Sequence, residues 1–174
     1  MPALYNGTNS FTYPPLAAKF STVTGNFDFV LLTIHTSPGV AGLEIPRLRL
    51  AMEEMSNTYS EPDVICLGDF NADGTYFSPG LVGGDLAGWP QPSYTTVIKN
   101  GADTTVSGND FTYDRIQLSK SLAEDYWGTS GVFRFGKYYD MRICEGAPTQ
   151  AGTEAALSDH YPVWADFKFD GDTD

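Results

Sequence analysis

Two nearly continuous apolar runs, separated by a helical pattern, constrain the fold of this chain more than any other feature. The runs FDFVLLTI (27–34) and DVICLGDF (63–70) are rich in β-branched and aromatic residues, which is typical of strands buried on both faces. Between the runs, apolar side chains recur at helical spacing, at Ile45, Leu48, Met52 and Met55. Pro46 suits the first turn of this helix. A strand, helix and strand with short connections predict a right-handed crossover and a parallel strand pair.

The rest of the chain is predicted to form shorter strands joined by irregular segments. Residues 71–110 are rich in Gly and Pro, with one short strand expected at YTTVIK (94–99). Alternating or aromatic-rich patterns predict further strands at FTYDRIQLS (111–119), GVFRFGKYY (131–139) and HYPVWADFKF (160–169). The chain therefore reads as an α/β domain with a mixed sheet.

Length and composition favour a single domain. The 174 residues are 41% hydrophobic and 14% aromatic, enough for one sizeable core. We expect a polar, loosely docked lead-in at 1–13, one domain at 14–169 and a frayed acidic tail at 170–174. No apolar run has the length of a membrane span, and the N-terminus lacks the pattern of a signal peptide. These features predict a soluble chain with no membrane partner and leave its localisation unknown.

The charge of the chain limits how it would hold a nucleic acid. The net charge is −12 at pH 7. Proteins that bind phosphate backbones through overall positive charge do so with many Lys and Arg residues. A nucleic-acid enzyme with this balance needs bound cations to offset the acidity near its site.

The segment Gly68-Asp69-Phe70-Asn71 carries the first candidate site. Asp69 and Asn71 are two residues apart in extended chain, so they project from the same face while Phe70 points into the core. A carboxylate beside an amide at a strand end can hold a hard cation and contact a phosphate oxygen. The alternative is that these residues simply end a strand and form a turn.

Two later segments and an earlier histidine extend this pattern. Ser158-Asp159-His160 places an acid next to an imidazole, and adjacent residues of a strand face opposite ways, so Asp159 suits a metal better than it suits His160. Asp114, in the run Tyr113-Asp114-Arg115, is a candidate to orient His160; the alternative is a surface Asp–Arg pair. His35 also follows a predicted strand, and its alternative is a hydrogen-bonded loop histidine.

Four motifs in this order resemble one known family. FDFVLLTIHTSP, GDFNAD, TYDRI and SDHYPVWADF are similar to the DNase I group of the endonuclease/exonuclease/phosphatase superfamily, and the match runs from about Phe11 to Phe167. The resemblance implies half or more of a DNase I-like four-layer α/β sandwich, in which a mixed sheet is packed by helices. It also implies phosphodiester hydrolysis that depends on Mg²⁺ or Mn²⁺.

The resemblance assigns roles to the candidate residues. It implies that His160 is the general base, with Asp114 as its partner. Asp69 and Asn71 would contact the scissile phosphate or the attacking water. Asp159 and Asp69 would bind the metal, and His35 would bind phosphate or protonate the leaving oxygen. Two further substrate contacts are expected, at Tyr76 and Thr105.

The stretch ADTTVSGND resembles the family's calcium loop. It places an oxygen at every second residue, at Asp103, Thr105, Ser107 and Asn109. In a curved loop, four such oxygens can converge on a structural Ca²⁺. The alternative is a polar surface loop.

The family's N-terminal part, with its metal-binding Glu, has no counterpart in this sequence. A sheet without that part is expected to expose an apolar face, which a second copy or a separate chain would cover. Three functions remain open. The first is a DNase I-like endonuclease acting on DNA, completed by self-association or a partner chain; the second is an inactive half domain acting as an assembly or binding module. The third keeps the chemistry but takes a phosphoinositide, a sphingolipid or a small phosphoester.

Overall fold

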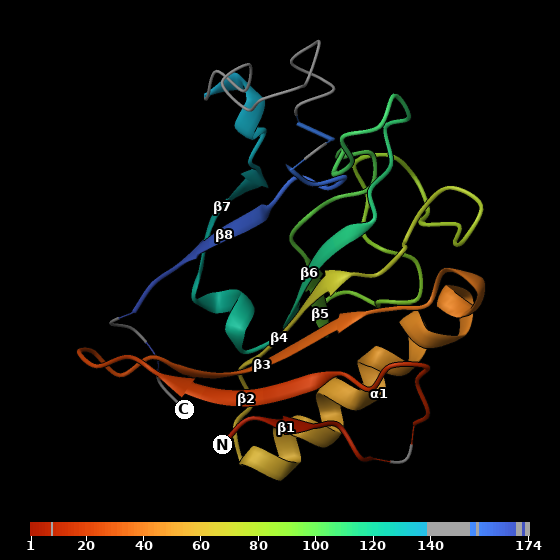
Figure 1. The fold of residues 1–174 in the computed structure, drawn as a ribbon. Coiled ribbons are helices and arrows are strands. Elements are labelled where there is room, and N and C mark those ends of the chain that lie inside the picture. The colour runs from red at the N-terminus through yellow and green to blue at the C-terminus, as the bar shows by residue number, and fades with distance from the viewer. Residues whose placement is uncertain (8, 139–153, 156, 170–171, 173–174) are drawn as a thin grey trace.

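A six-stranded mixed sheet carries a long helix on one face and a two-stranded sheet on the other (Figure 1). The structure, a computed structural model, describes all residues except 8, 139–153, 156, 170–171 and 173–174. The strands of the large sheet, in spatial order, are β1 (Ala3–Leu4), β2 (Leu16–Ser21), β3 (Asp28–His35), β4 (Val64–Asp69), β6 (Asp114–Ser119) and β5 (Tyr94–Thr96). The other elements are α1 (Ala41–Tyr59), β7 (Tyr126–Val132), β8 (Val163–Phe167) and three 3-10 turns, η1 (Pro38–Val40), η2 (Leu122–Glu124) and η3 (Phe135–Lys137).

The strand, helix and strand unit expected from the sequence is confirmed. β3 and β4 are parallel neighbours joined by α1, and their register pairs Val30 with Val64 and His35 with Asp69. The expected position of Pro46 in the first helical turn is wrong, because η1 leads directly into a helix that already begins at Ala41. Pro46 therefore lies inside the helix, where its ring removes one backbone hydrogen bond.

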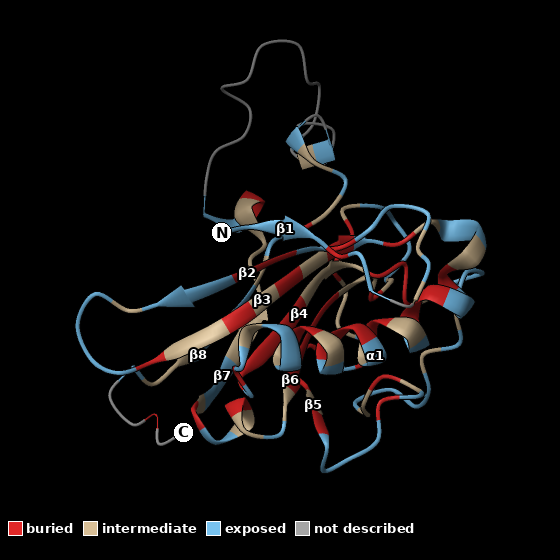
Figure 2. Ribbon diagram, turned by 90° about the horizontal axis from the view of Figure 1, so that it is seen from below, coloured by how far each residue is buried: buried red, intermediate tan, exposed pale blue. Residues whose placement is uncertain are grey.

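The core beneath the helix follows from strand alternation. In β3, Val30, Leu32 and Ile34 are buried, while the residues between them are only half-buried. These three side chains pack against the apolar stripe of α1, which includes Ile45 and Leu48. Figure 2 shows this stripe as the red segments along the side of α1 that faces the sheet.

The opposite face of the sheet is covered over β4 and β6 but open over β2. On the covered part, Ile116 and Leu118 of β6 belong to a second hydrophobic cluster. Every second residue of β8 packs against this cluster. These residues are Val163, Ala165 and Phe167, as the alternation in the sequence predicts. On β2, by contrast, Leu16 and Phe20 keep 43% and 46% of their surface exposed. Leu16 and Phe20 therefore leave some apolar surface exposed on this face of β2.

Several sequence expectations need correction. The segment 1–13 is not loosely docked throughout, because β1 pairs with β2 and Tyr5 is 4% exposed. The strand expected at 111–119 begins only at Asp114. Of the strand expected at 131–139, Gly131 and Val132 end β7 and Phe135–Lys137 form η3, while residue 139 lies outside the described residues.

The acidic tail 170–174 lies outside the described residues except for Asp172. Among the described residues, no helix combines the length and the apolar character needed to cross a membrane.

Candidate active site

Three strand ends bring the predicted site residues together. The register of the large sheet places His35 of β3 beside Asp69 of β4, and Asp69 beside Asp114 of β6. His160, just before β8, reaches the same edge and contacts both carboxylates. We call these four residues the strand-end cluster.

The side chains of the strand-end cluster contact one another in the order His35, Asp69, His160 and Asp114. His160 Nδ1 lies 2.7 Å from Asp114 Oδ2, a short hydrogen bond. His160 Nε2 lies 3.7 Å from Asp69 Oδ2, and His35 Nε2 lies 3.2 Å from the same oxygen. The Asp69 carboxylate therefore stands between two imidazoles, and Asp114 fixes the orientation of one of them.

The electrostatics of the cluster follow from this geometry. The hydrogen bond to Asp114, reinforced by the charges of Asp69 and Asp159, raises the pKa of His160 to about 9. Burial, and then the nearby charge of Asp114, raise the pKa of Asp69. Without a further cation at this edge, His160 is protonated at neutral pH.

The backbone around Asp69 is held by close contacts. Asn71, at a left-handed φ of 48°, donates its backbone N–H to Asp69 Oδ1 at 2.8 Å and its side-chain amide to the carbonyl of Thr36 at 2.9 Å. Gly68 has a φ of 136°, and a Cβ there would lie 1.9 Å from the carbonyl oxygen of Ile34. Asn71 is 4% exposed, so it supports Asp69 from behind.

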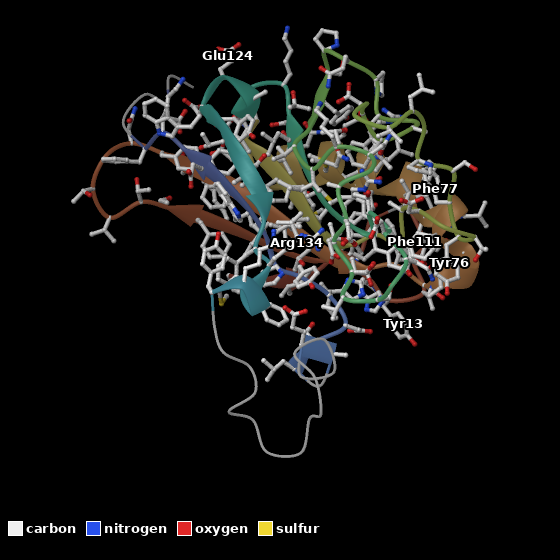
Figure 3. All side chains as sticks on the ribbon, turned by 90° about the horizontal axis from the view of Figure 1, so that it is seen from above. Tyr13, Tyr76, Phe77, Phe111, Glu124 and Arg134 are labelled. Atoms are coloured by element: carbon white, nitrogen blue, oxygen red, sulfur yellow. The ribbon has the colours of Figure 1, made fainter. Side chains whose placement is uncertain are left out.

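An aromatic rim lies next to the strand-end cluster. The ring of Tyr113 is 6.1 Å from that of His160 and stacks on Phe111 at 5.1 Å. Tyr76, one of the expected substrate contacts, lies 5.8 Å from Tyr113 and is 41% exposed. Figure 3 shows Tyr76 and Phe111 together at one side of the molecule. The rim presents exposed aromatic surface beside the histidines.

An open hollow of about 830 Å³ adjoins the other side of the cluster. Its lining joins the end of β3, the start of β2 and the loop before it, and includes Tyr13, Leu16, Thr33, His35 and Asp69. The hollow therefore connects the cluster to the exposed apolar part of the sheet.

The predicted metal ligands are only partly brought together. Asp69, Asp114 and His160 offer ligand atoms that lie within 4.8 Å of one another. Asp159 is exposed and does not belong to this group, although its charge reaches His160. The carboxylates of Asp69 and Asp114 are half-buried, and the pKa of Asp69 is raised. A cation bound between them would stabilise their charged forms.

The residues of the expected calcium loop also lie together, but their oxygens are engaged. Asp103 Oδ1 accepts hydrogen bonds from the backbone and hydroxyl of Thr105. The Thr105 hydroxyl also contacts Ser107 Oγ at 3.2 Å and the carbonyl of Asn109 at 2.8 Å. The remaining Asp103 oxygen pairs with Arg134 at 2.7 Å.

Sequence reasoning missed three supporting residues. Arg115 is fully buried and donates to the carbonyls of Ile98 and Ala72 and to Asn100 Oδ1, so the alternative of a surface Asp–Arg pair is wrong. Thr104 and Arg134 hold the loop behind the cluster. The only sequence signal for Arg115 was its place in a predicted strand.

Most of this chain is similar in sequence to known deoxyribonucleases. No protein-family model matches it. The chain is 31% identical to deoxyribonuclease-1 of Gallus gallus over 166 residues, which cover 90% of the chain and 54% of that protein. It is 32% identical to deoxyribonuclease-1-like 1 of Homo sapiens over 168 residues, 95% of the chain and 53% of that protein. The chain thus spans about half the length of the curated relatives it matches.

A solved structure supports the same fold. An endonuclease/exonuclease/phosphatase family protein from Bacteroides thetaiotaomicron superimposes with a TM-score of 0.50 at 18% identity, covering 89% of this chain and 56% of that one. The coverage of about half of each relative fits the C-terminal part of such a protein. With the strand-end cluster formed by the four motifs, the chain belongs to the DNase I-like group of the endonuclease/exonuclease/phosphatase superfamily.

Proposed function

We propose that this chain carries the water-activating part of a metal-dependent phosphodiesterase site that acts on DNA. One observation carries the proposal: a histidine hydrogen-bonded to a carboxylate at 2.7 Å, directly beside a second carboxylate and a second histidine. Phosphodiester hydrolysis requires a base for water, an acid for the leaving oxygen and positive charge near the phosphate. The strand-end cluster offers groups for each of these tasks.

His160 and Asp114 form the proposed base. In the neutral form of His160, Nδ1–H donates a hydrogen bond to Asp114. The other ring nitrogen, Nε2, is then free to take a proton from an attacking water. The raised pKa of His160 means that this base works only once its proton has left. We therefore expect the rate to rise with pH.

His35 and Asn71 complete the chain's own contribution. His35 is 69% exposed on its side chain and lies 3.2 Å from Asp69, so it can reach a phosphate oxygen or protonate the leaving group. Asn71 fixes the Asp69 carboxylate, and it remains a proposed contact to the phosphate or the water. Tyr76, in the aromatic rim, is the proposed contact to a neighbouring phosphate, and Thr105, which forms an isolated β-bridge with His160, stays a proposed substrate contact.

Asp69 would hold the divalent cation, Mg²⁺ or Mn²⁺, and Asp159, which lies outside the group of Asp69, Asp114 and His160, is the proposed second carboxylate. Burial, and then the charge of the nearby Asp114, raise the pKa of Asp69, and a bound cation would favour its charged form. When bound, the cation would neutralise phosphate charge and lower the pKa of nearby acids. It would also offset part of the net charge of −12, which opposes DNA.

DNA is the proposed substrate on two grounds. The curated relatives at 31% and 32% identity are named deoxyribonucleases, and the exposed ring of Tyr76 beside the half-buried rings of Phe111 and Tyr113 suits a ligand with flat bases. A phosphoinositide, a sphingolipid or a small phosphoester would use the same chemistry, and assays with these compounds alongside DNA separate the classes.

The exposed apolar face favours a second candidate function. Leu16 and Phe20 leave part of the sheet open next to the hollow at the site. We propose that a second copy, or a separate chain, covers this face and completes the site. If the site is inactive, the same face makes the chain an assembly or binding module.

Nicking of supercoiled plasmid tests the proposed activity. We expect nicking by the wild-type chain with Mg²⁺ or Mn²⁺, and none with EDTA or in His160→Ala. Asp114→Asn should lose most activity, whereas Asp166→Asn is a matched control because Asp166 is exposed on β8 and accepts a hydrogen bond from the Thr129 hydroxyl at 2.9 Å. Equal nicking by wild type and His160→Ala would reject the proposed base.

The mass of the purified protein in solution tests the assembly proposal. We expect a dimer that Phe20→Asp converts to monomer, because this change places a charge in the exposed apolar face. Val23→Asp is the control, since Val23 is fully exposed in the turn after β2. A stable wild-type monomer that nicks DNA would show that no second copy is needed.

A further inference from the structure

The loop 103–109 supports both halves of the His160–Asp114 pair. The hydroxyl oxygen of Thr104 accepts the backbone N–H groups of Tyr113 and Asp114, each at 3.1 Å. On its other side, the Thr104 carbonyl accepts the N–H of Tyr161 at 2.9 Å. The N–H of Val106 donates to the carbonyl of Asp159 at 2.8 Å. This loop therefore sets the distance between the segment that carries Asp114 and the segment that carries His160.

Asp103 anchors the start of this loop. One of its carboxylate oxygens accepts both the N–H and the hydroxyl of Thr105, at 3.0 and 3.1 Å. The other accepts Arg134 Nη2 at 2.7 Å, and the same nitrogen lies 3.3 Å from the Asp103 carbonyl. The Asp103 side chain is 11% exposed, so the ion pair is shielded from solvent on that side.

Arg134 is itself fixed in place. Its guanidinium carbon lies 5.0 Å from the centre of the Tyr161 ring, a distance typical of a cation–π contact. The hydrogen bond to Asp103 raises the pKa of Arg134 further, so the group stays charged. Figure 3 shows Arg134 near the middle of the molecule, between β7 and η3. One cation thus joins Asp103, in the loop, to Tyr161, next to His160.

A calcium ion does not fit this arrangement. Ca²⁺ binds six to eight oxygens, and negative charge among them gives it affinity. Here the Asp103 carboxylate is already neutralised by Arg134, and the single proton of the Thr105 hydroxyl can be donated either to Asp103 or to the carbonyl of Asn109. A divalent ion placed among these oxygens would also be repelled by the guanidinium.

We infer that Arg134 is the resident cation of the loop 103–109 and stands in place of the calcium ion that the sequence resemblance implies. The loop is then held without metal, and the support behind His160 and Asp114 is independent of calcium. This inference does not depend on nuclease activity, because it concerns how the loop is held.

Thermal unfolding in three buffers tests the inference on the wild-type chain. With EDTA, with Mg²⁺ and with Mg²⁺ plus millimolar Ca²⁺, we expect no Tm increase specific to Ca²⁺. A Ca²⁺-specific increase that Asp103→Asn abolishes would overturn the inference.

Removing the guanidinium gives the converse test. We expect Arg134→Met to lower Tm by about 3–6 °C, since a shielded charged hydrogen bond is lost while the apolar stem remains. Millimolar Ca²⁺ should restore part of this loss, because the Asp103 carboxylate is then free. Arg49→Met is the matched control: Arg49 is 33% exposed against 34% for Arg134, pairs with Glu53 at 2.9 Å, and its loss should change Tm by about 1 °C or less.

Hydrogen exchange locates the effect in the molecule. In Arg134→Met, the N–H groups of Val106 and Tyr161 should exchange faster relative to that of Cys66 in the core, and Arg134→Lys should restore part of the protection. If Arg134→Met leaves Tm and these two amides unchanged, or if Ca²⁺ raises the Tm of wild type and variant equally, Arg134 is not the cation of the loop.

Discussion

Replacing Asp114 by Asn removes the charge that holds His160 while keeping the shape of the side chain. In the wild-type chain, the hydrogen bond to Asp114 is the largest cause that raises the pKa of His160 from 6.5 to about 9. At about 1.4 kcal/mol per pKa unit, this rise corresponds to about 3–4 kcal/mol at most. The His160 side chain is 26% exposed, and Asp69 contributes too, so we expect Asp114→Asn to remove about 1–2 kcal/mol.

The pH dependence of this loss has a defined sign. The pKa of His160 is higher in the folded than in the unfolded chain, so its stabilisation is fully present below about pH 6.5 and is lost as the pH rises through about 9. The stability difference between wild type and Asp114→Asn should therefore be greatest below pH 6.5 and shrink toward pH 9. Urea unfolding in EDTA at several pH values measures it.

NMR titration measures the pKa directly. The chain has two histidines, so the spectrum contains two imidazole signals, and a His35→Ala spectrum identifies the signal of His160. We expect the pKa of His160 to fall by about one unit or more in Asp114→Asn and to stay unchanged in Asp166→Asn. An unchanged His160 pKa in Asp114→Asn would refute the assignment of this pair.

Three further substitutions test the surrounding structure. His35→Ala should change stability by less than about 0.5 kcal/mol, because its side chain is 69% exposed, yet should lower plasmid nicking by about a hundredfold or more. Gly68→Ala should destabilise the fold by more than about 2 kcal/mol in urea unfolding, because its Cβ would meet the Ile34 carbonyl at 1.9 Å. Arg115→Met should cost about 2–4 kcal/mol in the same assay, because it leaves three buried acceptors, including Asn100 Oδ1, without their donor.

Local sequence patterns predicted the central unit of the fold. Alternation and helical spacing placed β3, α1 and β4, and the parallel pairing that brings His35 beside Asp69 followed from the short connections. The placement of Asp114 against His160 needed the family resemblance, because these residues are 46 positions apart in the chain. A pairing over that distance leaves no local pattern.

Other features were not predictable from local patterns. β1 and β2 lack a strong alternation, and Tyr5 becomes buried through its contacts with the helix side of the sheet, including a hydrogen bond to Glu54. Arg115 reads as a surface residue because arginine is rarely fully buried, yet three oxygen acceptors surround it. The pairing of Arg134 with Asp103 likewise depends on the tertiary structure.

The pH dependence of plasmid nicking tests the central claim most directly, namely that His160, held by Asp114, activates the attacking water. With saturating Mg²⁺, we expect the rate of the wild-type chain to rise with pH as His160 loses its proton, and the rising limb of Asp114→Asn to lie at lower pH with a lower plateau. Asp166→Asn should follow the wild-type curve. Coincident rising limbs for wild type and Asp114→Asn would contradict the account.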